Sequence, residues 1–346
     1  MNAVRFHHYG GPECLEYEEV ADPVPSRGEA IVRVEACGVN HFDLDLRAGV
    51  SRVPLRLPHI LGLEVVGRIE HLPKACTSLK VGQRVLIRYE HSCGSCPPCV
   101  RSQPNLCMNV RMFGVSRPGG YAELTTCSVA DLLPVGDVLT APQWAAVQIA
   151  FGTAWHMMIT RGRLRPGETV LVNAAGSSVS TAALQIAKLA GATVIASAGS
   201  DWKLAKAKDY GADFTINYNS ETIHDSVMTL TGGDGVNMVV EHVGGPIFED
   251  SLRSLCPGGR IVTCGGHAGE VAALDLIELF RSERHVIGSR TWTRHEIETV
   301  IRLISDSRLR PVVDEVVPLN RVQEAHVRLA SREVFGKIVV SLEGQS

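Results

Sequence analysis

Four closely spaced cysteines have the clearest capacity for chemistry in this chain. They occur as Cys93-Gly-Ser-Cys96-Pro-Pro-Cys99, followed by Cys107. Thiolates at this spacing can close a tetrahedral cage around one zinc ion, and four protein ligands leave no open coordination position. We therefore predict a structural zinc ion, one per chain, that holds a loop and performs no chemistry. The alternative is disulfide pairing, although thiols this close in sequence pair with poor geometry.

A turn of small residues, Ala174 to Ser180, is the second candidate site. Dinucleotide phosphates bind where a strand runs through a tight turn into a helix whose first N–H groups face the anion. The glycines of that fingerprint would fall at Ala175, Ser177 and Ser180, so only Gly176 remains. The flanking strand–helix–strand pattern still favours a dinucleotide site, and a turn that binds nothing is the alternative. The expected cofactor contacts here are Ala175, Gly176, Ser177, Ser178 and Val179.

The end of the next strand bears on the choice between NAD and NADP. An NAD-selective site places an acidic residue there to hold the ribose 2′-hydroxyl group. This chain has Ala198 at that position, whereas Ser200 and Lys203 could bond a 2′-phosphate. We therefore predict NADPH as the cofactor. Asp201 would repel that phosphate if it turned inward, and we expect it to cap a helix that begins with Trp202.

The elements that must position these sites fall into two compositional regimes. A chain of 346 residues exceeds what one hydrophobic core usually serves, so two domains are expected. Up to about Val135, short apolar alternations broken by Gly and Pro predict a β-rich, barrel-like domain. From about Gly167, apolar strands alternate with helical stretches, which predicts a parallel sheet covered by helices. The predicted strands span 169–173, 193–198, 238–243, 260–264 and 286–290, the helices span 180–189, 201–210, 223–231 and 294–305, and extended segments at 312–318 and 336–342 return to the first domain.

Charge and composition exclude several classes of partner. The chain has 34 basic and 37 acidic residues, so it lacks the excess of positive charge that binding to nucleic acid or an anionic membrane requires. No apolar run reaches the length of a membrane span, and the first residues lack the apolar core of a signal peptide. We expect a soluble, cytoplasmic protein that acts on a small molecule. The other six cysteines are scattered singly, as reduced thiols would be.

Six segments, together with the cysteine lobe and the strand–helix–strand unit, resemble the medium-chain dehydrogenase/reductase superfamily. These segments are Gly11-Pro-Glu, Gly38-Val-Asn-His-Phe-Asp43, Gly119-Gly-Tyr-Ala-Glu, Leu164-Arg-Pro-Gly-Glu-Thr-Val-Leu-Val, Leu255-Cys-Pro-Gly-Gly-Arg and Phe335-Gly-Lys-Ile-Val. The resemblance implies an α/β protein with a GroES-like β-barrel catalytic domain, a Rossmann doubly wound parallel sheet, and a cleft between them where a nicotinamide meets its substrate. We place these domains at 1–136 and 137–290, with a C-terminal return at 291–346. The family also implies a homodimer or homotetramer that associates through Val286 to Arg290.

Departures from the family pattern separate its branches. Zinc-dependent alcohol dehydrogenases of this superfamily hold a catalytic zinc with a Cys, a His from a Gly-His-Glu motif, and a third Cys, Asp or Glu. Cys37 matches the first ligand, but the motif reads Gly62-Leu63-Glu64 and the third position falls near Ile149. One ligand in three does not hold a zinc ion. The hydroxyl that relays the alcohol proton would fall near Val39, so it is absent as well.

The segment Gly38 to Asp43 instead resembles the quinone oxidoreductase and enoyl reductase branch. A zinc lobe combined with a metal-free site resembles acryloyl-CoA reductase-like proteins. This branch implies hydride transfer to an activated C=C bond without metal. Asn40 would hydrogen-bond the nicotinamide ribose or the substrate, and His41 would donate a proton or make only a structural hydrogen bond. The candidate catalytic residues are Cys37, Asn40, His41 and Asp43.

Further cofactor contacts are implied outside the turn. Thr153, in Phe151-Gly-Thr-Ala-Trp155, would lie on the phosphate side of the nicotinamide. Ligands of open α/β sheets collect at the carboxyl ends of the strands. The residues expected to border the adenosine and nicotinamide there are Val243, Gly244, Cys264 and Gly265, with His242 and His267 as further pocket candidates.

These observations favour an NADPH-dependent reductase of an enone, a quinone or an enoyl-thioester, without a catalytic zinc. Two alternatives stay open. One is an alcohol or aldehyde dehydrogenase with a non-standard metal site formed by Cys37, His59 and Glu64, with His41 nearby. The other is a dehydrogenase-like binding or regulatory protein that has lost dinucleotide binding.

Overall fold

The computed structural model describes residues 1–342 and divides the chain into two compact units. Unit 1 comprises residues 1–149 and the chain from Pro311 onward, and unit 2 comprises Ala150–Arg310. Both divisions fall later in the chain than the boundaries expected at 136 and 290. Helix α10 (Arg294–Ser305) accounts for the second difference, because its Glu296 accepts a hydrogen bond from His156 of unit 2.

Unit 1 is built on a seven-stranded sheet with the order β16-β17-β3-β4-β5-β9, and β8 also pairs with β3. Strand β3 (Glu29–Gly38) pairs antiparallel with β4, β8 and β17. Ala30, Val32 and Val34 are buried at alternate positions, as a strand with one face on the core requires. The β-rich first domain is thereby confirmed. The two C-terminal strands, β16 and β17, lie parallel to each other and complete this sheet.

The remaining elements of unit 1 are short. Its other strands are β1 (Asn2–Arg5), β2 (Glu16–Glu19), β4 (Glu64–His71), β5 (Arg84–Ile87), β6 (Glu90–His91), β7 (Arg111–Met112), β8 (Leu124–Ser128), β9 (Leu132–Pro134), β16 (Val313–Pro318) and β17 (Lys337–Ser341). Its helices are α1 (His41–Ala48), α2 (Pro97–Val100), α3 (Ala141–Trp144) and α11 (Val322–Ala330), with 3₁₀ turns at Pro12–Cys14, Pro104–Leu106, Val129–Asp131 and Leu319–Arg321.

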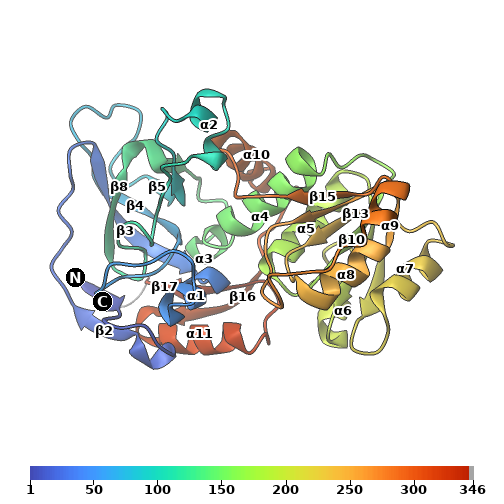
Figure 1. Cartoon of the computed structure of the whole chain (residues 1–346). Helices are drawn as coiled ribbons and strands as arrows, with labels where there is room; N and C mark the ends of the chain where they lie inside the picture. The colour runs from blue at the N-terminus through green and yellow to red at the C-terminus, as the bar shows by residue number, and fades with distance from the viewer. Residues whose placement is uncertain (343–346) are drawn as a thin grey trace. The chain divides into compact units, whose positions relative to one another are not determined.

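Unit 2 is a six-stranded parallel sheet with the order β12-β11-β10-β13-β14-β15. Its strands are β10 (Thr169–Val172), β11 (Thr193–Ala198), β12 (Phe214–Asn217), β13 (Val236–Glu241), β14 (Leu255–Thr263) and β15 (His285–Gly288). Its helices are α5 (Ser178–Leu189), α6 (Asp201–Lys208), α7 (Ile223–Leu230), α8 (Gly245–Arg253), α9 (Leu276–Arg281) and α10, and Figure 1 shows the helices among the strands of the sheet. Helix α4 (Gln148–Trp155) continues into a π-helical turn, His156–Arg161. The predicted doubly wound parallel sheet is confirmed.

Strand β12 and helices α8, α9 and α11 are among the elements that were not predicted. Strand β12 is a short edge strand, and Phe214 on it is exposed. Helix α8 begins with Gly245-Pro246, a pair that is typical of a loop, although proline fits the first turn of a helix. Within residues 1–342, no helix is long and apolar enough to cross a lipid bilayer.

The strand order of unit 2 defines a switch point between β10 and β13. From β10, the chain passes through α5 to β11 on one side, and β13 lies on the other side. In open α/β sheets, ligands bind at the carboxyl ends of the strands where the order reverses. The two loops at this point are the β10–α5 turn and the β13–α8 turn.

Candidate functional site

The four cysteines of the zinc lobe lie together at the surface of unit 1. Their Sγ atoms all lie within 4.8 Å of one another. The Sγ atom of Cys96 is 3.5 Å from that of Cys99 and 3.8 Å from that of Cys107. Four thiolates at a Zn–S distance of about 2.3 Å have sulfur atoms roughly 3.8 Å apart, so this donor set fits one tetrahedral zinc ion.

Backbone N–H groups donate to the sulfur atoms of Cys93 and Cys107. The amide of Cys93 donates to Sγ of Cys107 at 3.2 Å, and the amide of Cys96 donates to Sγ of Cys93 at 3.4 Å. The backbone N–H groups of Ser95 and Cys96 lower the pKa of the Cys93 thiol to about 5. All ten cysteines are free, so the disulfide alternative is not supported. Among the described residues, these four are the only group of three or more His, Cys, Asp or Glu side chains placed to hold a metal ion.

A buried ion pair lies among the predicted catalytic residues of unit 1. Nζ of Lys337 is 2.9 Å from Oε2 of Glu64, and the two side chains are 2% and 0% exposed. The pairing of β3 with both β4 and β17 brings these residues together, since Gly38 at the end of β3 lies opposite Glu64 and Val339. Sequence reasoning missed Lys337, although one charged residue in the apolar run Lys337-Ile-Val-Val was a signal.

The side chain of Asn40 bonds both members of this ion pair and the carbonyl of Gly38. Its Oδ1 accepts from Nζ of Lys337 at 2.6 Å. Its Nδ2 donates to the carbonyl of Gly38 at 3.2 Å and to Oε2 of Glu64 at 3.5 Å. The protein itself therefore fixes the orientation of the Asn40 amide. A contact of Asn40 with ribose or substrate remains a prediction.

Asp43 joins the start of α1 to the loop before β4. Its Oδ2 accepts from the amide of Asn40 at 2.9 Å, and its Oδ1 accepts from the amide of Gly62 at 3.2 Å. Burial raises the pKa of Asp43 to about 7, while these two N–H groups and the charge of Lys337 act in the opposite direction. These contacts hold the start of α1 against the loop that contains Gly62. His41, the first residue of α1, is half-buried beside them.

Cys37 lies in the same region but is fully enclosed. It is 0% exposed, and a Cβ atom built on Gly62 would lie 2.9 Å from its Sγ. Burial raises the pKa of Cys37 well above its ordinary value, so the neutral thiol predominates. Nε2 of His59 lies 2.9 Å from the carbonyl oxygen of Gly114 and donates to it. The described residues do not bring Cys37, His59 and Glu64 into a group with metal-ligand geometry.

In unit 2, the turn of small residues runs from the end of β10 into α5. Ala174 adopts a φ of 50°, so it is the left-handed residue of the turn. Ala175 is buried, and its amide donates to the carbonyl of Ser197 at 2.8 Å. Ser177 is the N-cap of α5, and its Oγ accepts from the amide of Val179 at 3.2 Å. The helix therefore begins at Ser178, two residues before the predicted start, with its N-terminus at the turn.

The end of β11 carries the residues expected to select the cofactor. Ser200 is the N-cap position of α6, which begins at Asp201. The predicted cap by Asp201 is wrong, because its Oδ1 instead accepts from Nδ2 of Asn217 at 2.6 Å. Nζ of Lys203 lies 5.4 Å from the ring centroid of Trp202. A Cβ atom on Gly199 would lie 3.1 Å from the hydroxyl oxygen of Tyr218, which sequence reasoning missed as a neighbour of this strand end.

After the β10–α5 turn and the end of β11, the third segment of the expected cofactor region is the β13–α8 turn. Strand β13 ends at Glu241, earlier than predicted, because Oε1 of Glu241 accepts from the amides of Val243 at 2.7 Å and Gly244 at 3.1 Å. Burial raises the pKa of Glu241. The next strand end carries Cys264, whose pKa burial raises to about 12, so this thiol is neutral. The adjacent Gly265 would meet the carbonyl of His242 at 2.8 Å if it carried a Cβ atom. Thr153 is half-buried in α4.

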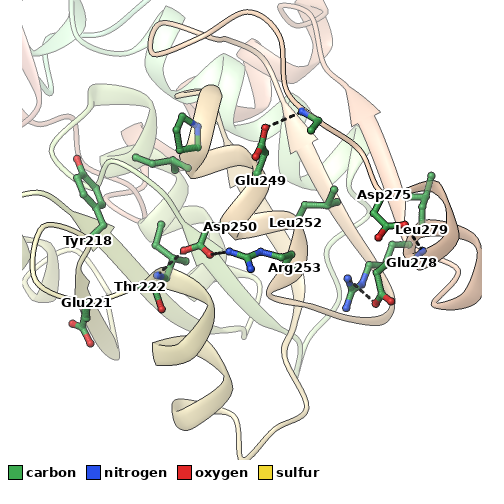
Figure 2. A pocket seen from close by; sticks show the side chains of 15 residues that line it. Tyr218, Glu221, Thr222, Glu249, Asp250, Leu252, Arg253, Asp275, Glu278 and Leu279 are labelled. Atoms are coloured by element: carbon green, nitrogen blue, oxygen red, sulfur yellow. Dashed lines mark hydrogen bonds and ion pairs between the residues drawn. The ribbon is translucent and has the colours of Figure 1, made fainter.

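Unit 2 also has a cavity of about 680 Å³ among α7, α8 and α9. Figure 2 shows its acidic lining residues tied to neighbouring groups: Asp250 pairs with Arg253, and Glu249 and Asp275 accept hydrogen bonds from the backbone. None of the predicted cofactor or catalytic residues lines this cavity. Tyr218, which lies beside the end of β11, does line it.

The two units and the cysteine lobe define a class: an oxidoreductase with a GroES-like domain, a Rossmann-type sheet and a metal-binding lobe. The family "Alcohol dehydrogenase GroES-like domain" matches residues 26–137, and "Zinc-binding dehydrogenase" matches residues 178–306. An alcohol dehydrogenase of Geobacillus stearothermophilus is 31% identical and covers 95% of this chain and 96% of its own. An acryloyl-coenzyme A reductase of Sulfurisphaera tokodaii is 29% identical, with 96% and 97% coverage.

A solved structure of an NAD-dependent alcohol dehydrogenase superposes with a TM-score of 0.95 at 38% identity, and the match covers 99% of this chain and 100% of that one. The chain belongs to the medium-chain dehydrogenase/reductase superfamily.

Proposed function

We propose that the protein is an NADPH-dependent reductase that reduces the activated C=C bond of an enone, a quinone or an enoyl-thioester without a catalytic zinc. Ser177, Ser200 and Lys203 would hold the dinucleotide, and the chemistry it would supply is a hydride for the β-carbon of the substrate. His41 is the proposed proton donor to the resulting enolate, with solvent as the alternative source. The single observation that carries the proposal is the Lys337–Glu64 ion pair.

This ion pair supports a metal-free reaction through its charge. A buried carboxylate requires a compensating cation. The ammonium of Lys337 meets that requirement for Glu64, and the enclosed Cys37 is a neutral thiol. The remaining positions of the family's catalytic zinc site are Leu63 and Ile149, whose side chains have no ligand atoms. The donor set therefore does not fit a second zinc ion.

The preference for NADPH rests on the strand end after β11. Ala198 leaves no carboxylate at the end of the strand, whereas Ser200, Lys203 and the nearby Tyr218 offer groups that can bond a phosphate. One solved relative is described as NAD-dependent, so a preference for NADH is the alternative that the experiment must exclude.

A fluorescence titration with NADPH and NADH tests the cofactor proposal directly. We expect tighter binding of NADPH, and Lys203→Ala should reduce the difference between the two. Equal or stronger binding of NADH would contradict the NADPH assignment. Failure of both to bind would favour a protein that has lost dinucleotide binding.

The substrate proposal is tested with enones, quinones and enoyl-thioesters in the presence of NADPH. Oxidation of NADPH with saturation of the C=C bond is the expected result, whereas turnover of alcohols alone would support the second candidate, an alcohol dehydrogenase. The similarity to alcohol dehydrogenases motivates that candidate. Metal analysis separates the two, because the reductase should hold one zinc per chain and the dehydrogenase two.

A further inference from the structure

The β10–α5 and β13–α8 turns are joined by a side-chain hydrogen bond at the switch point of the unit 2 sheet. Oγ of Ser180 lies 2.8 Å from Nε2 of His242. Ser180 belongs to the first turn of α5, and His242 directly follows β13. The bond therefore spans the two strand ends between which an open α/β sheet binds its ligand.

The direction of this hydrogen bond follows from the rest of the network. Oγ of Ser180 donates its only hydrogen to the carbonyl of Asn173 at 2.6 Å. It must therefore accept from His242, whose ring carries its hydrogen on Nε2. Enclosure of the ring and the charge of His267 lower the pKa of His242 to about 4, so the imidazole is neutral near pH 7.

The same network reaches the neighbouring strand and helix. Oδ1 of Asn173 accepts from Oγ of Ser197 at 2.8 Å, and its Nδ2 donates to Oγ of Ser251 at 2.7 Å. Asn173, Ser180, Ser197 and Ser251 are all 0% exposed. Buried and fully bonded polar networks of this kind hold their members in one arrangement.

Ser180 occupies the third glycine position of the dinucleotide fingerprint, where glycine normally permits close packing of helix on strand. Here the position carries a side chain that bonds both the strand end and the opposite loop. We propose that Ser180 and His242 are positioning residues for the dinucleotide, because their hydrogen bond fixes the separation of the two loops that receive it. This inference rests on the proposed dinucleotide function.

The proposal makes a prediction opposite to that of the sequence motif. Ser180→Gly restores a fingerprint glycine, so the motif predicts unchanged or tighter binding. Loss of the hydrogen bond should instead weaken NADPH binding about tenfold, which corresponds to one buried hydrogen bond. His242→Leu should have the same effect, and His242→Gln should recover most of the affinity, because the glutamine amide can place a donor near the former Nε2.

The experiment compares two probes for each variant: NADPH, which spans the switch point, and adenosine 2′,5′-bisphosphate, which lacks the nicotinamide half. We expect a loss of affinity for NADPH only. His295→Leu, an exposed histidine of the same unit, is the matched control. Hydrogen exchange of residues 174–178 and 242–245 in the ligand-free protein gives a second measurement, and it should be faster in Ser180→Gly and His242→Leu.

Three results would overturn the inference. One is unchanged NADPH affinity together with unchanged hydrogen exchange. Another is an equal loss of affinity for both probes, which would indicate general destabilisation. The third is a His242→Gln variant no better than His242→Leu. The cofactor proposal itself is overturned as well if the unmodified protein binds adenosine 2′,5′-bisphosphate but not NADPH, or binds neither. That result can be distinguished from failure of the inference, because it appears before any residue is substituted.

Discussion

Lys337 and Glu64 show how a single pair of residues can change the chemistry available to a site. A carboxylate that is 0% exposed carries a large desolvation penalty unless a cation is near. In this protein the cation is part of the chain, and it also orients Asn40. The charge of Glu64 is therefore balanced by a residue of the chain itself, and this pairing can be measured.

Replacing Lys337 with Met should leave the buried carboxylate of Glu64 without a cation and destabilise unit 1 by about 3–5 kcal/mol. The double variant Lys337→Met/Glu64→Gln should recover most of that loss, because both charges are then absent. Urea unfolding of the two single variants and the double variant measures the coupling. Arg294→Met, which removes an exposed ion pair with Glu298, is the control and should change stability by less than about 1 kcal/mol. Additive effects of the two substitutions would contradict the pairing.

Asp43 predicts a pH dependence of stability. Its pKa in the folded protein is about 7, above the value of 3.8 for the unfolded chain, so the folded state binds the proton more tightly. Its contribution is therefore most favourable at low pH and is lost as pH rises from about 4 to 7. The slope reaches at most about 1.4 kcal/mol per pH unit.

The difference between the unmodified protein and Asp43→Asn isolates this contribution, because Asn does not titrate. Asp43→Asn should be less stable overall, since one of the two backbone donors would face its amide NH₂ group. Its stability should nevertheless fall less steeply between pH 5 and 7, as measured by urea unfolding at several pH values. Parallel pH profiles for the two proteins would show that Asp43 is ionised throughout this range in the folded state.

At the scale of elements, we expect the cysteine lobe to depend on a bound zinc ion more than on packing. Helix α2 has four residues, and none of them is buried. The lobe should therefore lose its order when zinc is removed, because thiolate–metal bonds replace a hydrophobic core in such small structures.

Cys96→Ser should lower the zinc content from one ion per chain to near zero and should expose residues 93–107 to limited proteolysis. Cys37→Ser, which removes a buried thiol outside the lobe, should leave the zinc content unchanged. Metal analysis and mass spectrometry of the proteolytic fragments measure both effects. Loss of zinc in Cys37→Ser would instead indicate a second metal site at Cys37.

The elements also show what the sequence could predict. Helix α10 was placed at its observed bounds because its hydrophobic period is unambiguous, and β11 was placed at its bounds because it is a short, continuously buried run between turn residues. The clustering of the four cysteines was predictable because close spacing leaves little conformational choice. The Lys337–Glu64 pair was not, because strand pairing joins residues that are far apart in sequence. The Ser180–His242 bond was missed for the same reason, and Ser180 was interpreted only as a lost glycine.

At the scale of the whole molecule, unit 2 has an exposed apolar surface around β15 and α9. Strand β15 is the edge of its sheet, so one side of its backbone is unpaired. The exposed apolar residues on and near these elements are Val271, Leu276, Ile277, Phe280 and Val286. An edge strand beside apolar side chains is a template for pairing with a second copy of the chain. We therefore retain the prediction of a homodimer formed through β15, or a tetramer of two such dimers.

Val286→Lys should disrupt this association. The lysine of each chain would face its counterpart across the two-fold axis of the dimer, where little water could screen the repulsion between the two charges. The unmodified protein should have at least twice the chain mass of 37.4 kDa, and the variant should shift toward the monomer. Light scattering coupled to size exclusion measures both, and Val316→Lys, at an exposed position on β16 of unit 1, is the control. Cofactor affinity should change less than oligomeric state, since the switch point lies two strands away from β15 in the sheet order. A monomeric unmodified protein, or a Val286→Lys variant with unchanged mass, would contradict association through this strand.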